Sequence, residues 1–259
     1  MGIRIAFALD ADESARARTV AGRPRTMQTL TKLVIATTIA SIVFAALPEI
    51  DKAVAGYFFT PGLGFQFSQD ASLKWLRWLG RTAPSLALGL VVLILLVRVA
   101  RGRAWTSISD AGIAYILGVF AIAPLAMSNL LLKANWGRPR PSQTNLFSGN
   151  LDFTPAWRID GQCAWNCSFV SGEASMSMAL IAFAFVLPKR HRPAAVAAVC
   201  VWTAVVSANR MAFGAHYLSD VVLAAAMTAI VALALKAMLL DAAAPAVRAA
   251  PGRSAMKTA

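Results

Sequence analysis

Long apolar stretches separated by short polar segments dominate this chain. Six of them approach the roughly 17 to 25 residues that an α-helix needs to cross the hydrocarbon core of a bilayer. Ala and Gly are frequent in several stretches, and small residues let membrane helices pack closely. The pattern predicts an all-α fold, a polytopic bundle of six transmembrane helices. The expected spans are 31 to 48, 83 to 97, 111 to 132, 171 to 187, 194 to 208 and 219 to 238, of which the second and fifth are short.

Composition supports a membrane protein and argues against a nucleic-acid binder. The 259 residues are 58% hydrophobic and 14% charged, whereas soluble domains are about 45 to 50% apolar and roughly 25% charged. The net charge is +13. The Lys and Arg residues punctuate the apolar runs instead of gathering on one face, so the expected partner is the bilayer and not nucleic acid. The sequence leaves the oligomeric state open.

Three segments follow from this reading. Residues 1 to 30 contain only the short apolar run "IAFAL" and no small-residue cleavage site, so we expect a basic cytoplasmic segment and not a signal peptide. Residues 31 to 240 would form the six-helix domain. Residues 241 to 259 would be a disordered cytoplasmic tail.

The distribution of Lys and Arg predicts the orientation. With six spans, one set of loops (1 to 32, 98 to 110, 188 to 193 and 236 to 259) holds 16 of the 25 Lys and Arg residues, and the other side holds 9. Cytoplasmic loops carry the excess, so both termini would be cytoplasmic. The motif "KANWGRPRP", with Lys133, Arg138 and Arg140, would then face outward, on the side where basic residues are scarcer. Such an exception suggests a bound anion, although contact with lipid headgroups is the alternative explanation.

Two other outward segments have structural interpretations. In "DASLKWLRWLGR", residues 70 to 81, Trp and Leu alternate with Lys and Arg. This pattern is typical of an amphipathic helix lying in the membrane interface, and we expect no role in substrate handling. The motif "CAWNC" holds Cys163 and Cys167, which we expect to form a disulfide in an oxidising compartment. Cys200 falls within the fifth span, where a small buried hydrophobe is expected.

One histidine has neighbours that suggest chemistry. His191 lies in the cytoplasmic turn "PKRHRP", where a solvated role is expected, whereas His216 lies in "NRMAFGAHYLSD" on the outer side. Asp220 follows His216 by four positions and shares its face if a helix has begun there. A carboxylate so placed can fix the imidazole tautomer and leave the other nitrogen as a base or nucleophile. Arg210 precedes His216 by six.

A third outer segment, "CSFVSGEASMSMAL", opens the fourth span at Ser171 and Gly172. Unpaired amides at a helix N-terminus bind anions, and glycine permits close approach. Three outer helix ends thus carry phosphate-binding groups: Lys133 with Arg140, the Ser171 and Gly172 amides, and Arg210 beside His216. Guanidinium groups suit phosphate oxygens.

These residues resemble the three-part signature of the type 2 phosphatidic acid phosphatase (PAP2) family, whose core fold is shared with vanadium haloperoxidases. The matching positions are Lys133, Arg140 and Pro141; Ser171 and Gly172; and Arg210, His216 and Asp220. The resemblance implies a phosphatase of a bacterial inner membrane that needs no metal or other cofactor and hydrolyses lipid phosphates at the outer, periplasmic face. It implies that His216 forms a phosphohistidine, that Asp220 orients it, and that Lys133, Arg140, Arg210 and the two amides hold the phosphoryl oxygens.

The middle part departs from the family pattern. Where members usually carry a histidine that protonates the leaving oxygen, this chain has Glu173. Glu173 is either a helix-start acid favoured by the macrodipole or a replacement general acid, which would need a raised pKa. A better leaving group depends less on protonation by a general acid. The substitution therefore favours substrates such as lipid A 1-phosphate or polyprenyl diphosphate over phosphatidic acid.

Other functions compete with this hypothesis. A lipid phosphotransferase would use the same residues, and a non-catalytic or transport-type phospholipid-binding protein would keep the anion site without chemistry. His216 with Asp220 favours an enzyme. Six apolar spans argue against a soluble haloperoxidase.

Overall fold

The computed structural model describes residues 25 to 102 and 108 to 242. The segments predicted as an N-terminal basic region and a disordered tail lie almost entirely outside these residues. Within them five helices are long and apolar enough to cross a membrane: α2 (Arg25–Ala46), α4 (Ala71–Arg101), Asp110–Lys133, α8 (Arg192–Ala212) and Leu218–Asp241. The shorter apolar stretch Gly172–Val186, made of α6 (Gly172–Ala179) and α7 (Ile181–Val186), is the sixth. The all-α prediction of six helices is confirmed.

Two of the long spans change helical geometry along their length. The third span begins as α5 (Asp110–Phe120) and continues as the π-helical stretch η3 (Ala121–Lys133). The last begins as α9 (Leu218–Leu235) and continues as η6 (Lys236–Asp241). Pro124 lies inside η3, where its missing amide prevents a regular hydrogen-bond ladder.

Helix α6 lies in the middle of the bundle. It packs against α9, α8, η3 and α4, and its sequence GEASMSMA places small residues at the contacts. Small side chains allow close approach of helices where no hydrophobic driving force acts between them. The Ser175 hydroxyl lies 2.7 Å from that of Thr228 on α9. By contrast, α2 and α4 present many exposed apolar side chains, as expected for helices that face lipid.

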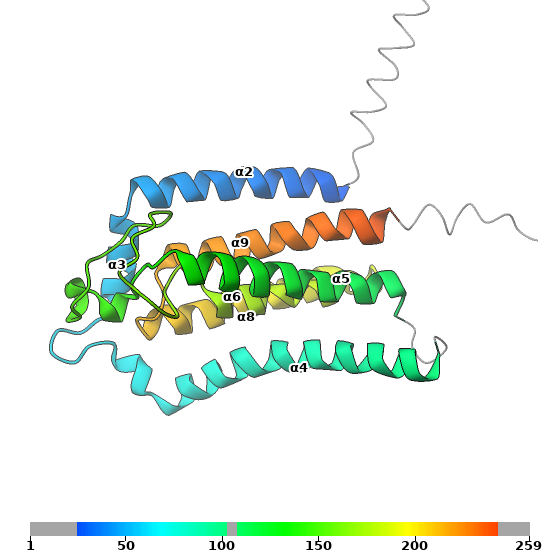
Figure 1. Cartoon of the computed structure of the whole chain (residues 1–259), viewed down its shortest axis with the longest axis horizontal. Coiled ribbons are helices and arrows are strands. Elements are labelled where there is room, and N and C mark those ends of the chain that lie inside the picture. The colour runs from blue at the N-terminus through cyan, green and yellow to red at the C-terminus, as the bar shows by residue number, and fades with distance from the viewer. Residues whose placement is uncertain (1–24, 103–107, 243–259) are drawn as a thin grey trace, which may run out of the picture.

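Polar segments gather at one end of the bundle (Figure 1). They comprise α3 (Glu49–Tyr57), residues 58 to 70 with η1 (Gln66–Gln69), and the long connection 134 to 171 with η4 (Pro141–Gln143) and η5 (Asn145–Phe147). The end of α8 and the start of α9 lie at the same end. We call this region the loop end of the bundle.

Two predictions were wrong. The stretch 70 to 81 does not form a separate interfacial helix, because α4 runs without interruption from Ala71 to Arg101 and Asp70 caps its start by accepting from the Leu73 amide. Cys200 is not buried but exposed on α8. In a membrane helix the lipid solvates an apolar side chain as well as a protein core does, which removes the expected need to bury it.

Candidate functional site

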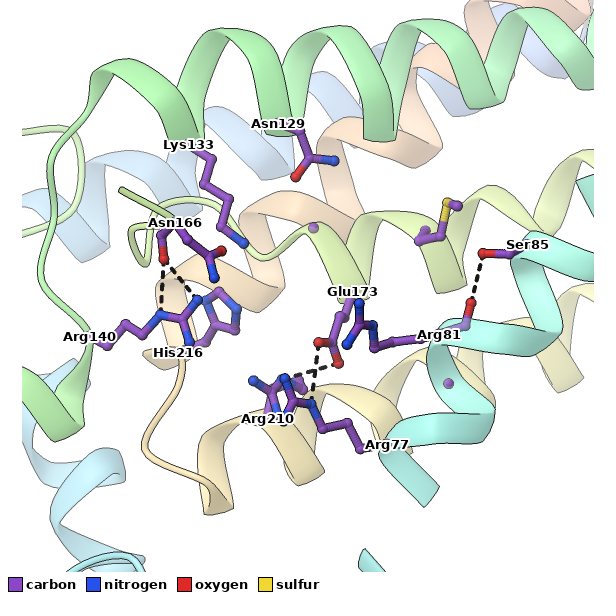
Figure 2. A pocket seen from close by; sticks show the side chains of 13 residues that line it. Arg77, Arg81, Ser85, Asn129, Lys133, Arg140, Asn166, Glu173, Arg210 and His216 are labelled. Carbon is purple, nitrogen blue, oxygen red and sulfur yellow. Dashed lines mark hydrogen bonds and ion pairs between the residues drawn. The ribbon is translucent and has the colours of Figure 1, made fainter. Parts of the chain in front are cut away.

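A cavity of about 380 Å³ lies at the loop end. Polar residues from each of the segments predicted to hold functional residues line it. Figure 2 shows its lining side chains. Of the sequence-predicted site residues, it brings together Lys133, Arg140, Gly172, Glu173, Arg210 and His216. The predicted convergence of three distant segments is therefore found in the fold.

Lys133 ends η3, and Arg140 lies seven residues later in extended backbone before η4. The Arg140 guanidinium donates two hydrogen bonds, of 3.1 and 2.8 Å, to the carbonyl oxygen of Asn166. Burial lowers the pKa of Arg140, and the nearby charge of Arg77 lowers it further. Crowded cations of this kind are stabilised when an anion binds between them.

Arg138, the third cation of "KANWGRPRP", does not face the cavity. Its side chain is fully buried and donates to Asp220 at 2.6 Å, to Asp51 of α3 at 2.7 Å and to the carbonyl of Thr154 at 2.8 Å. Burial alone would lower the pKa of Arg138, but the two carboxylates raise it. Spacing along the sequence could not show that alternate basic residues of the motif point to different sides.

His216 occupies the turn between α8 and α9 and is 2% exposed. Its Nδ1 atom lies 2.8 Å from the carbonyl oxygen of Ser168. A carbonyl can only accept, so the neutral ring carries its proton on Nδ1 and keeps a lone pair on Nε2. Burial lowers the pKa of His216 to about 4, against the opposing influence of the Asp220 carboxylate. A neutral imidazole with a free Nε2 at the cavity wall is a competent nucleophile.

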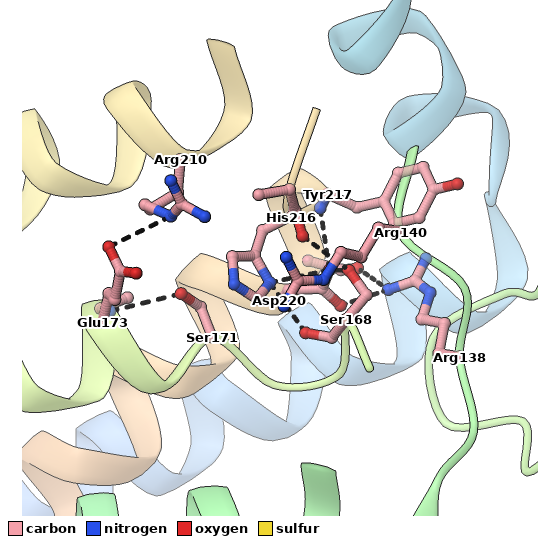
Figure 3. Close-up of polar contacts among 12 residues, drawn as sticks. Arg138, Arg140, Ser168, Ser171, Glu173, Arg210, His216, Tyr217 and Asp220 are labelled. Atoms are coloured by element: carbon pink, nitrogen blue, oxygen red, sulfur yellow. Dashed lines mark hydrogen bonds and ion pairs between the residues drawn. The ribbon is translucent and has the colours of Figure 1, made fainter. Parts of the chain in front are cut away.

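Asp220 supports the histidine less directly than predicted. Its carboxylate is 3.7 Å from Nδ1 of His216, too far for a hydrogen bond. Instead it accepts from the Ser168 hydroxyl at 2.5 Å and the Tyr217 amide at 2.8 Å, and from Arg138 (Figure 3). Asp220 therefore fixes the segment that carries the Ser168 carbonyl, which in turn orients the ring.

Ser171 and Gly172 open α6 as predicted, but only Gly172 lines the cavity. The Ser171 amide donates to the carbonyl of Asp220 at 3.1 Å, and its hydroxyl caps the helix by accepting from the Ala174 amide. The prediction that the Ser171 amide binds phosphate is therefore wrong. The amides of Gly172 and Glu173 belong to the first helical turn, which has no intrahelical acceptors for them.

Glu173 lies between two arginines. Its carboxylate is 3.1 Å from Nε of Arg210 and 3.6 Å from Nε of Arg77. Arg210 is 2% exposed, yet its Nε and Nη1 atoms make no geometrically acceptable hydrogen bond within the described residues. A buried guanidinium with unsatisfied donors is costly unless an anion completes its bonding. Through these ion pairs the Glu173 carboxylate can orient the guanidinium groups of Arg210 and Arg77. The role of Glu173 as a general acid stays a prediction.

Seven residues that line the cavity were not predicted. They are Arg77, Gly80, Arg81 and Ser85 of α4, Asn129 of η3, Asn166, and Met176 of α6. The expectation that residues 70 to 81 play no part at the site is therefore wrong. The helical spacing of Arg77 and Arg81 was visible in the sequence, but only the packing of α4 against α6 and α8 turns that face toward the cavity.

Cys163 and Cys167 are bonded to each other, with Cα atoms 5.7 Å apart. The cross-link closes a short loop that contains Asn166, the acceptor for Arg140. Within residues 25 to 102 and 108 to 242, no group of three or more His, Cys, Asp or Glu side chains is placed to hold a metal ion. The cavity offers cations and amides to an anion.

Fold and site together define a polytopic helical membrane protein with a cavity that is lined by cationic side chains and by a buried histidine. Residues 111 to 243 match the PAP2 superfamily, and the chain belongs to this family. It is 44% identical over 122 residues to a lipid A 4'-phosphatase of Rhizobium leguminosarum, an alignment covering 47% of this chain and 52% of the relative. It is 35% identical over 186 residues to a lipid A 4'-phosphatase of Francisella tularensis subsp. novicida, covering 71% and 83%.

The chain thus spans about half the length of the Rhizobium relatives that it matches. Its fold is similar to the crystal structure of a transmembrane PAP2 type phosphatidylglycerolphosphate phosphatase from Bacillus subtilis, with a TM-score of 0.53 and 19% identity over 81% of this chain and 94% of that one. At this identity the likeness concerns the fold alone.

Proposed function

We propose that the protein is a membrane lipid phosphatase that hydrolyses a phosphomonoester of lipid A or a similar phosphoglycolipid. The observation that carries the proposal is the neutral, buried His216, with Nδ1 held by the Ser168 carbonyl, at the wall of a cavity that also holds Lys133, Arg140 and Arg210. Phosphoryl transfer needs positioning and neutralisation of charge on the equatorial oxygens. These residues supply both.

The proposed reaction has two steps. Nε2 of His216 attacks phosphorus, the bond from phosphorus to the lipid oxygen breaks, and a phosphohistidine forms. The departing oxygen takes up a proton, from solvent or from Glu173. Water then attacks the phosphohistidine, which releases inorganic phosphate and restores the imidazole. Lys133, Arg140, Arg210 and the Gly172 amide hold the phosphoryl oxygens throughout.

The names of the two relatives bear on which phosphate of lipid A is the substrate. Both are named lipid A 4'-phosphatases, which supports the 4'-phosphate over the 1-phosphate that the leaving-group argument favoured. With a purified chain and lipid A carrying both phosphates, we expect mass spectrometry to show loss of the 4'-phosphate. Loss of the 1-phosphate alone would contradict this substrate assignment but leave the phosphatase activity intact.

The nucleophile is tested by replacing each histidine separately. His216→Ala should abolish phosphate release while lipid binding persists, and His191→Ala, in the turn before α8, is the matched control that should retain wild-type rates. Wild-type enzyme quenched during turnover should carry acid-labile phosphate, absent from His216→Ala. Phosphate release by His216→Ala would exclude the proposed mechanism.

The proposed location is a bacterial inner membrane, with both termini cytoplasmic and the loop end facing the periplasm. The excess of Lys and Arg in the segments predicted to be cytoplasmic supports this orientation. A reporter that is active only in the cytoplasm, fused after residue 242, should be active. An inactive cytoplasmic reporter together with an active periplasmic one would reverse the orientation.

A further inference from the structure

The cavity holds more positive charge than one phosphate needs. Five of its lining residues are cationic and one, Glu173, is anionic; the cations are Arg77, Arg81, Lys133, Arg140 and Arg210. A bound phosphomonoester carries about −1.5 to −2. His216 is neutral, and the nearby Asp220 is already paired with Arg138. Substrate phosphate and Glu173 therefore leave about two cationic charges without a partner.

Two of the five cations, Arg77 and Arg81, lie on α4. Lys74, Arg77, Arg81 and Ser85 are spaced by three, four and four residues on α4, so they share one face. In Figure 2, Lys133 and Arg140 lie on the side of His216, whereas Arg210 lies beside Arg77, and both of these arginines contact Glu173. The cationic face of α4 therefore meets the phosphate-binding groups at Arg77, whereas Lys74 lies outside the lining of this cavity.

Arg77 and Arg81 on this face have donors available to a ligand, while the exposed Lys74 donates from Nζ to the Gln69 side chain at 3.3 Å. Nε of Arg77 is buried without a hydrogen-bond partner among the described residues, and its contact with Glu173 is a long one of 3.6 Å. The Arg81 guanidinium has no hydrogen bond or ion pair within the described part of the chain, and the nearby Ser85 hydroxyl donates to the Arg81 carbonyl instead. These guanidinium donors therefore remain for an anion.

A second hollow extends the cavity along the same face. Its volume is about 620 Å³, it shares Arg77, Arg81 and Ser85 with the first, and it adds Lys74 and Trp78. A group attached to the substrate next to the scissile phosphate can therefore reach the cations of α4 while the phosphate contacts His216.

Building on the proposed function, we propose that Lys74, Arg77 and Arg81 form a second anion subsite, which binds a further phosphate or carboxylate on the head group that carries the scissile phosphate. The subsite selects multiply anionic lipids over lipids with a single phosphate. Arginine suits this role because its planar fork pairs with either kind of oxyanion.

The test compares two synthetic glycolipids in neutral detergent micelles. Both carry the same acyl chains and the same scissile phosphate, and one has an added carboxylate on a neighbouring sugar carbon. We expect the wild type to prefer the carboxylated lipid by about tenfold in kcat/KM, a typical effect of one hydrogen-bonded charge pair. The double variant Lys74→Gln, Arg81→Gln should bring this ratio close to one, through KM.

Arg158→Gln is the matched control, since Arg158 is exposed on the same end of the bundle but does not line the cavity. This variant should keep the wild-type ratio. That result would exclude a nonspecific attraction between the protein and charged micelles as the cause of the preference. An unchanged ratio in the double variant would overturn the proposal. Binding of both lipids to His216→Ala gives the same comparison without turnover.

A further experiment distinguishes two possible sources of the second anion, the head group of the substrate and a neighbouring lipid. Phosphatidylglycerol is added to micelles of the singly charged substrate. If its addition raises the wild-type rate and the double variant removes that gain, the subsite binds neighbouring lipids and the head-group assignment is wrong. Hydrolysis of the singly charged lipid by the wild type tests the proposed function independently, because it does not depend on the ratio.

Discussion

Nδ1 of His216 is oriented by the carbonyl oxygen of Ser168, 2.8 Å away, and not by a carboxylate. Asp220 acts one contact further out, through the Ser168 hydroxyl at 2.5 Å. Where a carboxylate alone sets the tautomer of a catalytic histidine, its conversion to an amide costs about 10⁴-fold in rate. A backbone carbonyl cannot donate and therefore continues to specify the Nδ1–H tautomer.

Asp220→Asn should therefore lower kcat by about 10- to 100-fold, well short of the loss in His216→Ala. Phosphate release in single-turnover experiments measures this, with size-exclusion profiles showing that the variant is folded. A loss as complete as that of His216→Ala would show that the carboxylate itself orients or charges the ring.

The lowered pKa of His216 predicts the pH dependence of the reaction. The protonated ring cannot attack phosphorus, so kcat/KM should fall as pH drops through about 4 and show no loss from this group near 6.5. Since the Asp220 anion favours the protonated ring, Asp220→Asn should move this limb to lower pH. The substrate phosphate also titrates, near about pH 6, but equally for both enzymes, so their difference isolates His216. If the acidic limb of the pH profile does not move in Asp220→Asn, the assignment of this limb to His216 is wrong.

The buried Arg138 links α3 to the site. Asp51 accepts from Arg138 at 2.7 Å and from the Ser219 amide at 2.8 Å, with both charged side chains inaccessible to solvent. Removing one partner of a buried ion pair costs about 3 to 5 kcal/mol. Asp51→Asn should therefore lower the free energy of unfolding by about 3 kcal/mol, and the midpoint of thermal unfolding in detergent by about 6 to 12 °C.

Glu49→Gln is the control for this change, because Glu49 lies two residues away in an exposed pair with Lys52. Exposed pairs contribute about 0 to 1 kcal/mol. Equal shifts in the two variants would mean that the buried network does not stabilise the fold.

The ion pairs of Glu173 predict a modest effect of its amide. Glu173→Gln keeps the shape of the side chain but removes the charge between Arg210 and Arg77. We expect kcat to fall by less than about tenfold and inorganic phosphate to bind more tightly, because it no longer competes with a resident anion. Steady-state kinetics with phosphate as inhibitor measures both. A drop of about 10² to 10⁴ in kcat would instead identify Glu173 as the general acid.

The helical spans and six of the thirteen residues that line the cavity could be predicted from the sequence, because both depend on local patterns. Apolar runs predict spans. Lys133, Gly172 and Arg210 lie in the first or last turn of a helix, and Arg140 and His216 lie in the connections next to these helices. The predicted bounds were short at α4 and α8, since Trp, Arg and Pro at their ends lower the apolar signal without ending the helix.

Relationships between segments could not be predicted in this way. Arg138 and Arg140 are two residues apart, yet one is buried among carboxylates and the other lines the cavity. The Ser168 carbonyl carries no sequence signal, because every residue has one. Asp51 acquires its role only when α3 packs against the start of α9.

The disulfide predicts how Arg140 is held in the site. Cys163 and Cys167 close the loop whose Asn166 carbonyl accepts both hydrogen bonds from Arg140. Without the cross-link Arg140 must be ordered on binding, at about 0.5 to 1.5 kcal/mol for a flexible side chain. Replacing both cysteines by Ala should therefore raise KM about 2- to 12-fold with a smaller change in kcat. Cys200→Ala, on the exposed face of α8, is the control. An unchanged KM in the double variant would show that Arg140 is held without the loop.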